Sequence, residues 1–390
     1  MRIGVVVDND FYSDIRVLKQ VKLLASAKHE VFVLCLQGSR KAVNLGPNVK
    51  VIPKQLSPSL KNTLYFFANL VPAYQYWWSK QVANLITEEN IEAIHGHDLY
   101  MSSPIYKGIG KSKKGVKFVL DLHENFPEAI KGYNWANSGI RKFLVRPEMW
   151  EKKEQYLLSL PDNIVVLHQN YKKELLEKYP EIANEKFVVY PNFLDLDRFE
   201  QYEASKLEAY QNVDNVILYF GNIAERRGVF EAINCFAKIV KKHPSSKLLF
   251  VGPVDKADQE KFFASIEDES MVHIPWIDLS ELPSYLATAT IALAPFIPNP
   301  QHNSGVANKI FQYMYGARPI VASDCRPQKE LIKELQCGMI YTNQDEFYEA
   351  LDYLILNPEE GVAMGQRGKE ALNTVLNPKG YDTEFLRLYA

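Results

Sequence analysis

The stretch Val216-Ile-Leu-Tyr-Phe-Gly-Asn-Ile-Ala-Glu-Arg-Arg-Gly-Val-Phe230 gives the clearest sign of the fold. An apolar run ends at Phe220, Gly221 turns the chain, and an amphipathic helical pattern begins near Gly228. This order is typical of a buried parallel strand that leads into a crossover helix. Further apolar runs follow, separated by helical patterns, at 247–251, 271–274, 291–295, 319–322 and 339–341. They predict a parallel sheet in the C-terminal half of the chain.

The same alternation fills the N-terminal half, where a helical pattern at 15–27 lies between the first two predicted strands. The predicted strands are 3–7, 31–36, 93–95, 117–120 and 163–166. Two separate series predict an α/β fold with two Rossmann-like parallel-sheet domains, at 1–195 and 205–377, joined through turn residues and charges that begin at Tyr190. Because ligands of such sheets bind at the carboxyl ends of the strands, the cleft that the two domains face is the predicted active site.

Composition narrows the class of protein. The 390 residues are 47% hydrophobic and 24% charged with a net charge of -2, which is typical of a soluble globular protein and excludes disorder. Four dispersed cysteines without a C-x-x-C pair indicate a reducing compartment and no zinc or disulfide framework. Asp8 and Asp10 end the first apolar run too early for a signal peptide, and no run reaches the about 18 apolar residues of a membrane span. We therefore expect a cytoplasmic protein, or one peripheral on the inner face of the cell membrane, with no nucleic-acid partner.

Charge is unevenly distributed between the halves. Residues 1–190 hold 26 Lys and Arg against 19 Asp and Glu, whereas residues 191–390 hold 19 against 28. A basic first half is consistent with an anionic partner, although ordinary scatter of surface charge explains it equally well.

Two segments of the second domain carry candidate binding residues. At the turn after Gly221, Arg226 and Arg227 would place guanidinium groups beside a phosphate or diphosphate near a helix start; the alternative is a plain turn with solvated arginines. In the later polar segment a short helix is predicted from about Val306. Before this helix, Ser304 and Gly305 are expected to donate hydrogen bonds to a ligand. Within it, Lys309 and Gln312 are three residues apart and so share a face; the alternative for the segment is helix capping followed by a core helix.

In the first domain, His123 and Glu124 directly follow a predicted strand, so they can hydrogen-bond a sugar or act as acid or base. A structural histidine is the alternative. His95 and His97, with His123 as a third ligand, suggest a metal. We do not favour a metal site, because the two residues of the His-x-His pair are expected to point to opposite sides. Asp195-Leu-Asp197 is interpreted as a turn.

Together these segments resemble the retaining GT-B glycosyltransferases of family 4, also called group 1. The resemblance lies in short motifs that occur in family order over nearly the whole chain. They are His123-Glu-Asn-Phe-Pro127, Gly221 through Arg227-Gly228, Asn308-Lys-Ile-Phe-Gln-Tyr-Met314 with Gly316 and Pro319, and weaker echoes at 11–17, 95–98, 190–192 and 365–368. The resemblance implies a GT-B architecture whose first domain binds the acceptor and whose second binds the donor nucleotide. It also implies that the C-terminal segment, 378–390, crosses back to pack on the first domain.

Site roles follow from the same resemblance. Arg227 matches the basic residue on the donor diphosphate, Lys309 assists it, and His123 matches the histidine that contacts the donor sugar. Ser304 and Gln312 stand where many members carry two glutamates, so Gln312 would hold the ribose without a charge, at a loss of roughly 1 kcal/mol. Asn222 replaces a common arginine, and Asp8–Asp14 replaces a glycine-rich loop. The expected catalytic residues are His123, Arg227 and Lys309; the donor-binding residues are Gly221, Asn222, Arg226, Ser304, Gly305 and Gln312; and the acceptor-side candidates are Asp14, Arg16, His97 and Glu124.

The predicted activity is transfer of a sugar from a UDP- or GDP-linked donor to an acceptor hydroxyl with retention, without a metal or other cofactor. A saccharide or lipid-linked saccharide is the expected acceptor, in polysaccharide or glycolipid assembly. The alternatives are a non-catalytic nucleotide-sugar-binding protein and an epimerase or phosphorylase of the same fold. The aromatic stretch Leu64–Trp78 and lysines at 107, 111, 113, 114 and 117 suggest contact with an anionic membrane, against the alternative of a core helix and a solvated loop.

Overall fold

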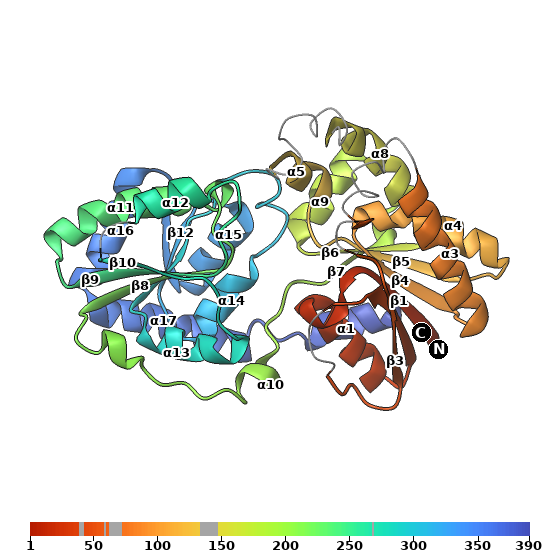
Figure 1. Cartoon of the computed structure of the whole chain (residues 1–390), viewed down its shortest axis with the longest axis horizontal. Coiled ribbons are helices and arrows are strands. Elements are labelled where there is room, and N and C mark those ends of the chain that lie inside the picture. The colour runs from red at the N-terminus through yellow and green to blue at the C-terminus, as the bar shows by residue number, and fades with distance from the viewer. Residues whose placement is uncertain (39–42, 58–59, 62–71, 133–146, 267–268) are drawn as a thin grey trace. The chain divides into compact units, whose positions relative to one another are not determined.

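The computed structural model describes residues 1–38, 43–57, 60–61, 72–132, 147–266 and 269–390 (Figure 1). The chain divides into two compact units. The first comprises Met1–Pro191 together with Lys379–Ala390, and the second comprises Asn192–Pro378. Each unit contains a parallel sheet with helices on both faces, which is the two-domain α/β fold expected from the sequence.

The described strands of the first unit form a seven-stranded parallel sheet of order β3-β2-β1-β4-β5-β6-β7. The strands are β1 Arg2–Asp10, β2 Glu30–Leu36, β3 Val49–Lys54, β4 Ala93–His97, β5 Lys117–Asp121, β6 Asn163–Val166 and β7 Phe187–Val189. Sequence analysis missed β3 and β7, the two edge strands, and ended β4 two residues early. The strand order reverses between β1 and β4, and such a switch point is where parallel sheets bind ligands.

Both faces of this sheet are buried, and successive strand residues alternate between two cores. Val6 and Leu34 contribute to one core, whereas Val5 and Val33 contribute to the other. This explains why the strands are continuous apolar runs. The helices of the unit, including short 3-10 helices (η), are η1 Phe11–Ser13, α1 Ile15–Ser26, α3 Ala73–Glu88, η2 Leu99–Met101, α4 Ser102–Ser112, α5 Phe126–Gly132, α8 Pro147–Ser159, α9 Gln169–Lys178, η3 Asn184–Lys186 and α18 Lys379–Arg387.

The C-terminal helix α18 belongs to the first unit although the second unit precedes it in the chain. Phe385 and Tyr389 are buried in the same core as α1 and one face of the sheet. The hydroxyl of Tyr190 donates to Asp382 at 2.8 Å, which ties the helix to the chain just after β7. The last residues of the chain therefore complete the first unit.

The described strands of the second unit form a six-stranded parallel sheet of order β10-β9-β8-β11-β12-β13. They are β8 Asn215–Phe220, β9 Ser246–Val251, β10 Met271–Ile274, β11 Ile291–Ala294, β12 Ile320–Ser323 and β13 Gly338–Tyr341. Each lies within one residue of a run identified in the sequence. The strand order reverses between β8 and β11, so the ends of these two strands are the natural ligand position.

Helices cover both faces of the second sheet (Figure 1). They are α10 Leu196–Phe199, η4 Glu208–Tyr210, η5 Glu225–Arg227, α11 Val229–Lys242, α12 Gln259–Ser265, η6 Leu279–Glu281, α13 Leu282–Thr288, α14 Asn308–Tyr315, α15 Arg326–Leu335, α16 Gln344–Leu356 and α17 Pro358–Asn373. In the described part of the chain, none of the helices in either unit combines the length and hydrophobicity that a bilayer span requires.

The aromatic stretch noted in the sequence lies partly outside the described residues, at 64–71. In the described part, α3 buries Tyr74 and Trp78 in the core, as the core-helix alternative expected, and leaves Tyr76 exposed. Lys107 and Lys113 are also exposed. The packing of α3 thus accounts for two of its aromatic side chains, and membrane contact stays a prediction.

Candidate functional site

Two glycines shape the turn between β8 and α11. Gly221 follows β8 with φ +125°, and a Cβ added there would lie 3.4 Å from the Lys309 Nζ atom. Gly228 precedes α11 with φ +70°, and a Cβ there would lie 1.5 Å from the Pro295 carbonyl oxygen. Only glycine fits at Gly228, because both its φ and this contact exclude a side chain. The turn that carries the two arginines is therefore held tightly against the end of β11.

Lys309 lies in the first turn of α14 with only 8% of its surface exposed. Its Nζ atom is 3.7 Å from the centroid of the Tyr219 ring and 5.0 Å from that of Phe296, and it has no hydrogen-bond partner. Burial, followed by the charge of Arg227, holds the pKa of Lys309 well below its usual value. A buried amino group without a hydrogen-bond acceptor is costly to protonate, so Lys309 is suited to an anionic ligand that favours its charged form.

Arg227 brings a second cation to the same place. Its guanidinium carbon lies 5.2 Å from the centroid of Phe296, the ring that Lys309 also faces. Like charges repel strongly in a partly dry environment unless an anion neutralises them. The ring of Phe296 thus supports both cations by cation–π contact, and their proximity favours a ligand with at least two negative charges.

A tyrosine of α14 fixes Lys309 at the switch point. The Tyr313 hydroxyl accepts a hydrogen bond from the Phe220 backbone at 2.9 Å and donates to the Leu293 carbonyl at 3.0 Å. These contacts tie the helix to the ends of β8 and β11. Lys309 is four residues earlier and so lies on the same face of the helix. The lysine is therefore positioned by the helix packing.

The other predicted donor-binding residues lie in this turn, in the loop before α14, or on α14 itself. Asn222 is half-buried, and its carbonyl accepts from the Tyr219 hydroxyl at 2.6 Å. Gln312 is buried on α14. Because α14 begins at Asn308, Ser304 lies before the helix, where its hydroxyl donates to the Gln301 carbonyl at 2.7 Å. Their contacts with a ligand, and those of Gly305, stay predictions.

Sequence analysis did not single out His302, which the structure places beside these cations. The side chain is buried, its ring centroid lies 4.9 Å from that of Phe296, and Arg227 and Lys309 both act on its charge. The only signal available was a histidine in the polar loop two residues before Ser304. Distinguishing it from an ordinary loop histidine requires the fold.

In the first unit, Asp121 is fully buried at the end of β5 and forms the centre of a polar network. Arg16 donates to its two oxygens at 3.0 and 2.8 Å, and Gln20 donates at 2.6 Å. Burial alone would raise the pKa of Asp121, but the Arg16 guanidinium and His95 hold it well below its usual value. Arg16, an acceptor-side candidate, is thus engaged with Asp121, and its predicted contact with an acceptor stays a prediction.

His123 lies beside this network with carboxylates around it. Its Nε2 atom is 2.9 Å from Nδ1 of His97, and its Nδ1 atom is 3.6 Å from a carboxylate oxygen of Asp14. Burial lowers the pKa of His123, but Asp98, Asp14 and Asp121 together raise it above its usual value. A protonated His123 would donate to His97, whose own pKa burial lowers far below normal. The structure therefore brings together three of the predicted residues, His123, His97 and Asp14.

Acidic groups extend the same edge of the sheet. Asp14 caps α1 by accepting from the backbone of Arg16 and Val17, both at 3.1 Å. Burial and nearby carboxylates, among them Glu124, raise the pKa of Asp98 to about 7, although His123 lowers it. Carboxylates of this kind hydrogen-bond sugar hydroxyls, so the edge could bind a saccharide.

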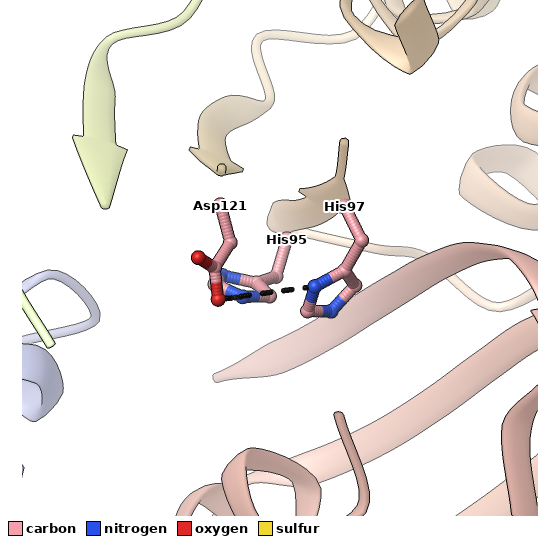
Figure 2. Close-up of side chains that lie close together, drawn as sticks. All are labelled: His95, His97 and Asp121. Carbon is pink, nitrogen blue, oxygen red and sulfur yellow. Dashed lines mark ion pairs between the residues drawn. The ribbon is translucent and has the colours of Figure 1, made fainter. Parts of the chain in front are cut away.

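Our expectation that His95 and His97 point to opposite sides is wrong. Their ring centroids are 4.6 Å apart, because residues two apart on a strand face the same side. Figure 2 shows both rings beside Asp121, and the potential ligand atoms of these three residues lie within 4.8 Å of one another. Hydrogen bonds from Arg16 and Gln20 already occupy the Asp121 oxygens, however, and a guanidinium at 2.8 Å opposes a cation. The arrangement favours a hydrogen-bonded network over a metal centre.

Asp195 and Asp197 lie at the start of the second unit. The Asp195 carboxylate accepts from the Arg198 backbone at 3.4 Å and caps the short helix α10. This agrees with the interpretation of Asp195-Leu-Asp197 as a local turn.

Comparison with known proteins relates both units to one enzyme class. A family model described as Glycosyltransferase Family 4 matches residues 15–198, and one described as Glycosyl transferases group 1 matches residues 214–357. The chain carries a family 4 glycosyltransferase domain followed by a group 1 glycosyltransferase domain. Together the two matches include every site residue discussed above except Asp14.

Two relatives share part of the sequence of this chain. An uncharacterized glycosyltransferase of Methanocaldococcus jannaschii is 28% identical over 148 residues, which are 37% of this chain and 34% of that protein. The chain thus spans about a third of that relative's length. An uncharacterized 41.2 kDa protein in the cps region of Klebsiella pneumoniae is 25% identical over 272 residues, or 64% of this chain and 72% of that protein.

Solved structures show the same fold. Sucrose-phosphate synthase from Thermosynechococcus elongatus matches with a TM-score of 0.76 at 14% identity, covering 100% of this chain and 98% of that one. HepE from Anabaena, solved in complex with UDP and glucose, matches with a TM-score of 0.72 at 12% identity and covers 99% and 98%. The two parallel-sheet domains are those of the GT-B glycosyltransferase fold, as the resemblance implied.

Proposed function

We propose that this chain transfers a sugar from a nucleoside-diphosphate sugar to an acceptor hydroxyl with retention of anomeric configuration. The observation that carries the proposal is the pair of cations over Phe296, Arg227 at 5.2 Å and the unpartnered Lys309 at 5.0 Å. A diphosphate supplies the charge that these groups require. The HepE complex with UDP and glucose supports a uridine nucleotide as the first donor to test.

The same side chains can stabilise the transition state of sugar transfer. Cleavage of the anomeric bond leaves an oxocarbenium-like sugar and places negative charge on the departing diphosphate. Arg227 and Lys309 are fixed before the reaction by cation–π contacts and helix packing, so they stabilise this charge without reorganisation. In the proposed mechanism the acceptor hydroxyl attacks on the same face and the leaving phosphate takes its proton. These groups replace the charge neutralisation that a metal would supply.

For the first unit we propose the roles that the resemblance implies. His123, whose pKa is raised by the carboxylates around it, would contact the donor sugar, while Asp14 and Glu124 would hydrogen-bond a saccharide acceptor. The location of the Klebsiella relative in a cps region is consistent with an acceptor in polysaccharide assembly.

A thermal-shift panel tests the donor class. We expect UDP or GDP to raise the unfolding temperature of the chain by several degrees, because ligand at a hundred times its Kd stabilises by about 2.7 kcal/mol. Uridine and guanosine, which lack the diphosphate, serve as matched controls and should have little effect. Equal stabilisation by nucleoside and nucleoside diphosphate would contradict a phosphate-centred site.

A non-catalytic nucleotide-sugar-binding protein is the second candidate, favoured by the neutral Gln312 at the expected ribose position. Such a protein would bind UDP or GDP in this panel, and in a transfer assay it would release no nucleoside diphosphate from a nucleotide sugar with any acceptor. Detection of donor turnover or hydrolysis excludes it. The same assay distinguishes an epimerase, which would release no free nucleotide, and a phosphorylase, which would require phosphate.

We further propose that exposed lysines of the first unit contact anionic lipid. Lys107 is exposed on α4 and Lys114 just beyond that helix, and each basic residue near such a surface contributes about 1 kcal/mol. The chain is expected to co-float with liposomes containing anionic lipid and not with neutral liposomes. Replacing both lysines by glutamate should weaken flotation strongly. A wild-type chain that stays in the aqueous fraction with anionic liposomes would remove this proposal.

A further inference from the structure

His302 is held in one orientation by its own loop. Its backbone N–H donates to the Asn299 side-chain oxygen at 2.9 Å, and its Nδ1 atom lies 2.7 Å from the Ile297 carbonyl oxygen. The Asn299 amide nitrogen is 3.1 Å from the same Nδ1, but it donates to the Ile297 carbonyl at 3.2 Å. Because a carbonyl can only accept, Nδ1 carries the ring proton.

This assignment leaves Nε2 as the unprotonated nitrogen of the neutral ring. Nε2 is buried and has no hydrogen-bond partner, and only 7% of the residue is exposed. The ring packs against Phe296, the same side chain over which Arg227 and Lys309 lie. Three nitrogen-bearing side chains from the loop, η5 and α14 thus gather around one aromatic ring.

The electrostatic environment explains why the ring is neutral. Burial, together with the charges of Arg227, Arg226 and Lys309, lowers the pKa of His302 to about 4. On its own loop the facing groups are Asn299 and the Ile297 carbonyl, which are uncharged and only partly offset this effect. The free protein therefore holds a neutral His302 at pH 7, beside the guanidinium groups of Arg226 and Arg227 and the amino group of Lys309.

We propose that His302 is a third phosphate-binding residue of this site, whose Nε2 takes up a proton when the diphosphate of a nucleotide sugar binds. This inference rests on the proposed function. The bound anion would neutralise Arg227 and Lys309 and accept a hydrogen bond from Nε2–H, and both effects favour the protonated ring. No other atom of His302 changes its partner, since Nδ1–H keeps its bond to Ile297.

Proton uptake by His302 would make the affinity for the nucleotide sugar depend on pH. Binding raises the pKa of His302 from about 4, so between the free and bound pKa values the complex holds one more proton than the free protein. In that window the affinity falls by up to about tenfold for each unit of rising pH. Above the bound pKa the ring is neutral in both states and the dependence disappears.

Isothermal titration calorimetry of the full chain measures this proton directly. UDP-glucose and GDP-mannose are suitable probes, because their diphosphates are diesters that keep a constant charge near pH 6. Titrations in two buffers of different ionisation enthalpy at pH 6 are expected to show uptake of about one proton per bound ligand. Binding without proton uptake would overturn the inference and leave the proposed function intact. If neither probe binds at saturating concentration, the proposed function fails and this inference fails with it.

Substitutions assign the proton to a residue. His302→Gln keeps a neutral N–H donor but cannot titrate, so we expect measurable binding with the proton uptake lost. His302→Asn, which can preserve the bond to Ile297, covers the case in which the loop needs that anchor. His243→Gln is the matched control, since His243 pairs with Asp352 on α16 and should leave the uptake unchanged. Undiminished proton uptake in His302→Gln would place the proton on Lys309 and refute the proposal.

Discussion

Replacing Arg227 by alanine is expected to reduce sugar transfer at least a hundredfold while the fold stays intact. The guanidinium is one of two cations that would stabilise the charge on the departing diphosphate, and loss of one such preorganised donor costs a factor of about 10² to 10³ in rate. Arg227 is only half-buried on the short helix η5, so the free energy of unfolding should change little. Steady-state transfer assays and urea unfolding of the same variant measure the two effects.

The control for this variant is Lys238→Ala, which removes a positive charge from an exposed position on α11. The control variant should retain nearly full activity, because solvent screens the charge of an exposed side chain outside the site. Transfer at the wild-type rate by Arg227→Ala would contradict the role assigned to the arginine. A similar loss in both variants would show that net charge, and not the position of Arg227, matters.

Replacing Lys309 by methionine is expected to separate stability from function. Methionine keeps a long apolar side chain against Tyr219 and removes the buried amino group, which has no hydrogen-bond partner. Removing such an unsatisfied group should raise the free energy of unfolding by about 1–3 kcal/mol. The same change should abolish most of the affinity for a nucleoside diphosphate and lower transfer at least a hundredfold. Urea unfolding without ligand and calorimetry with UDP measure the two effects.

Lys309→Arg is the informative companion, because it keeps the charge and changes the geometry. We expect it to retain more anion affinity than Lys309→Met and to gain no stability. If Lys309→Met destabilised the free chain, the lysine would be a structural element of the core. An increase in the free energy of unfolding with unchanged UDP affinity would instead show that the anion does not bind beside α14.

Most of the fold could be predicted from hydrophobic runs, because strands that are buried on both faces need continuous apolar residues. The four central strands of the second unit and five strands of the first follow this rule, whereas the edge strands β10 and β13 are largely half-buried and were found from their short apolar runs. The edge strand β3, Val49–Lys54, does not, since exposed and half-buried residues interrupt it, and β7 spans only three residues. Their pairing depends on neighbouring strands rather than on their own composition.

The candidate site could be predicted only where its residues belong to a single turn or a single helix. Gly221 and Arg227 belong to a single βα turn, and the packing of α14 brings Lys309 to it, as the order of the motifs suggested. Contacts over long separations were beyond such reasoning. Arg16 and Asp121 are 105 residues apart, and no local pattern indicates that one binds the other.

The error over His95 and His97 has a different origin. It came from neglecting the two-residue period of a strand, which places alternate side chains on one face. A correct reading would have brought the pair together at the end of β4, but it would still not have shown that Arg16 and Gln20 occupy the third potential ligand, Asp121.

The most direct test is a crystal structure of the full chain grown with UDP or GDP at saturating concentration. The expected result places phosphate oxygens within hydrogen-bonding distance of Lys309 Nζ and the Arg227 guanidinium, beside Gly221. Nucleotide bound elsewhere, with no phosphate oxygen near Lys309 Nζ or the Arg227 guanidinium, would contradict the assignment of a diphosphate site to this turn.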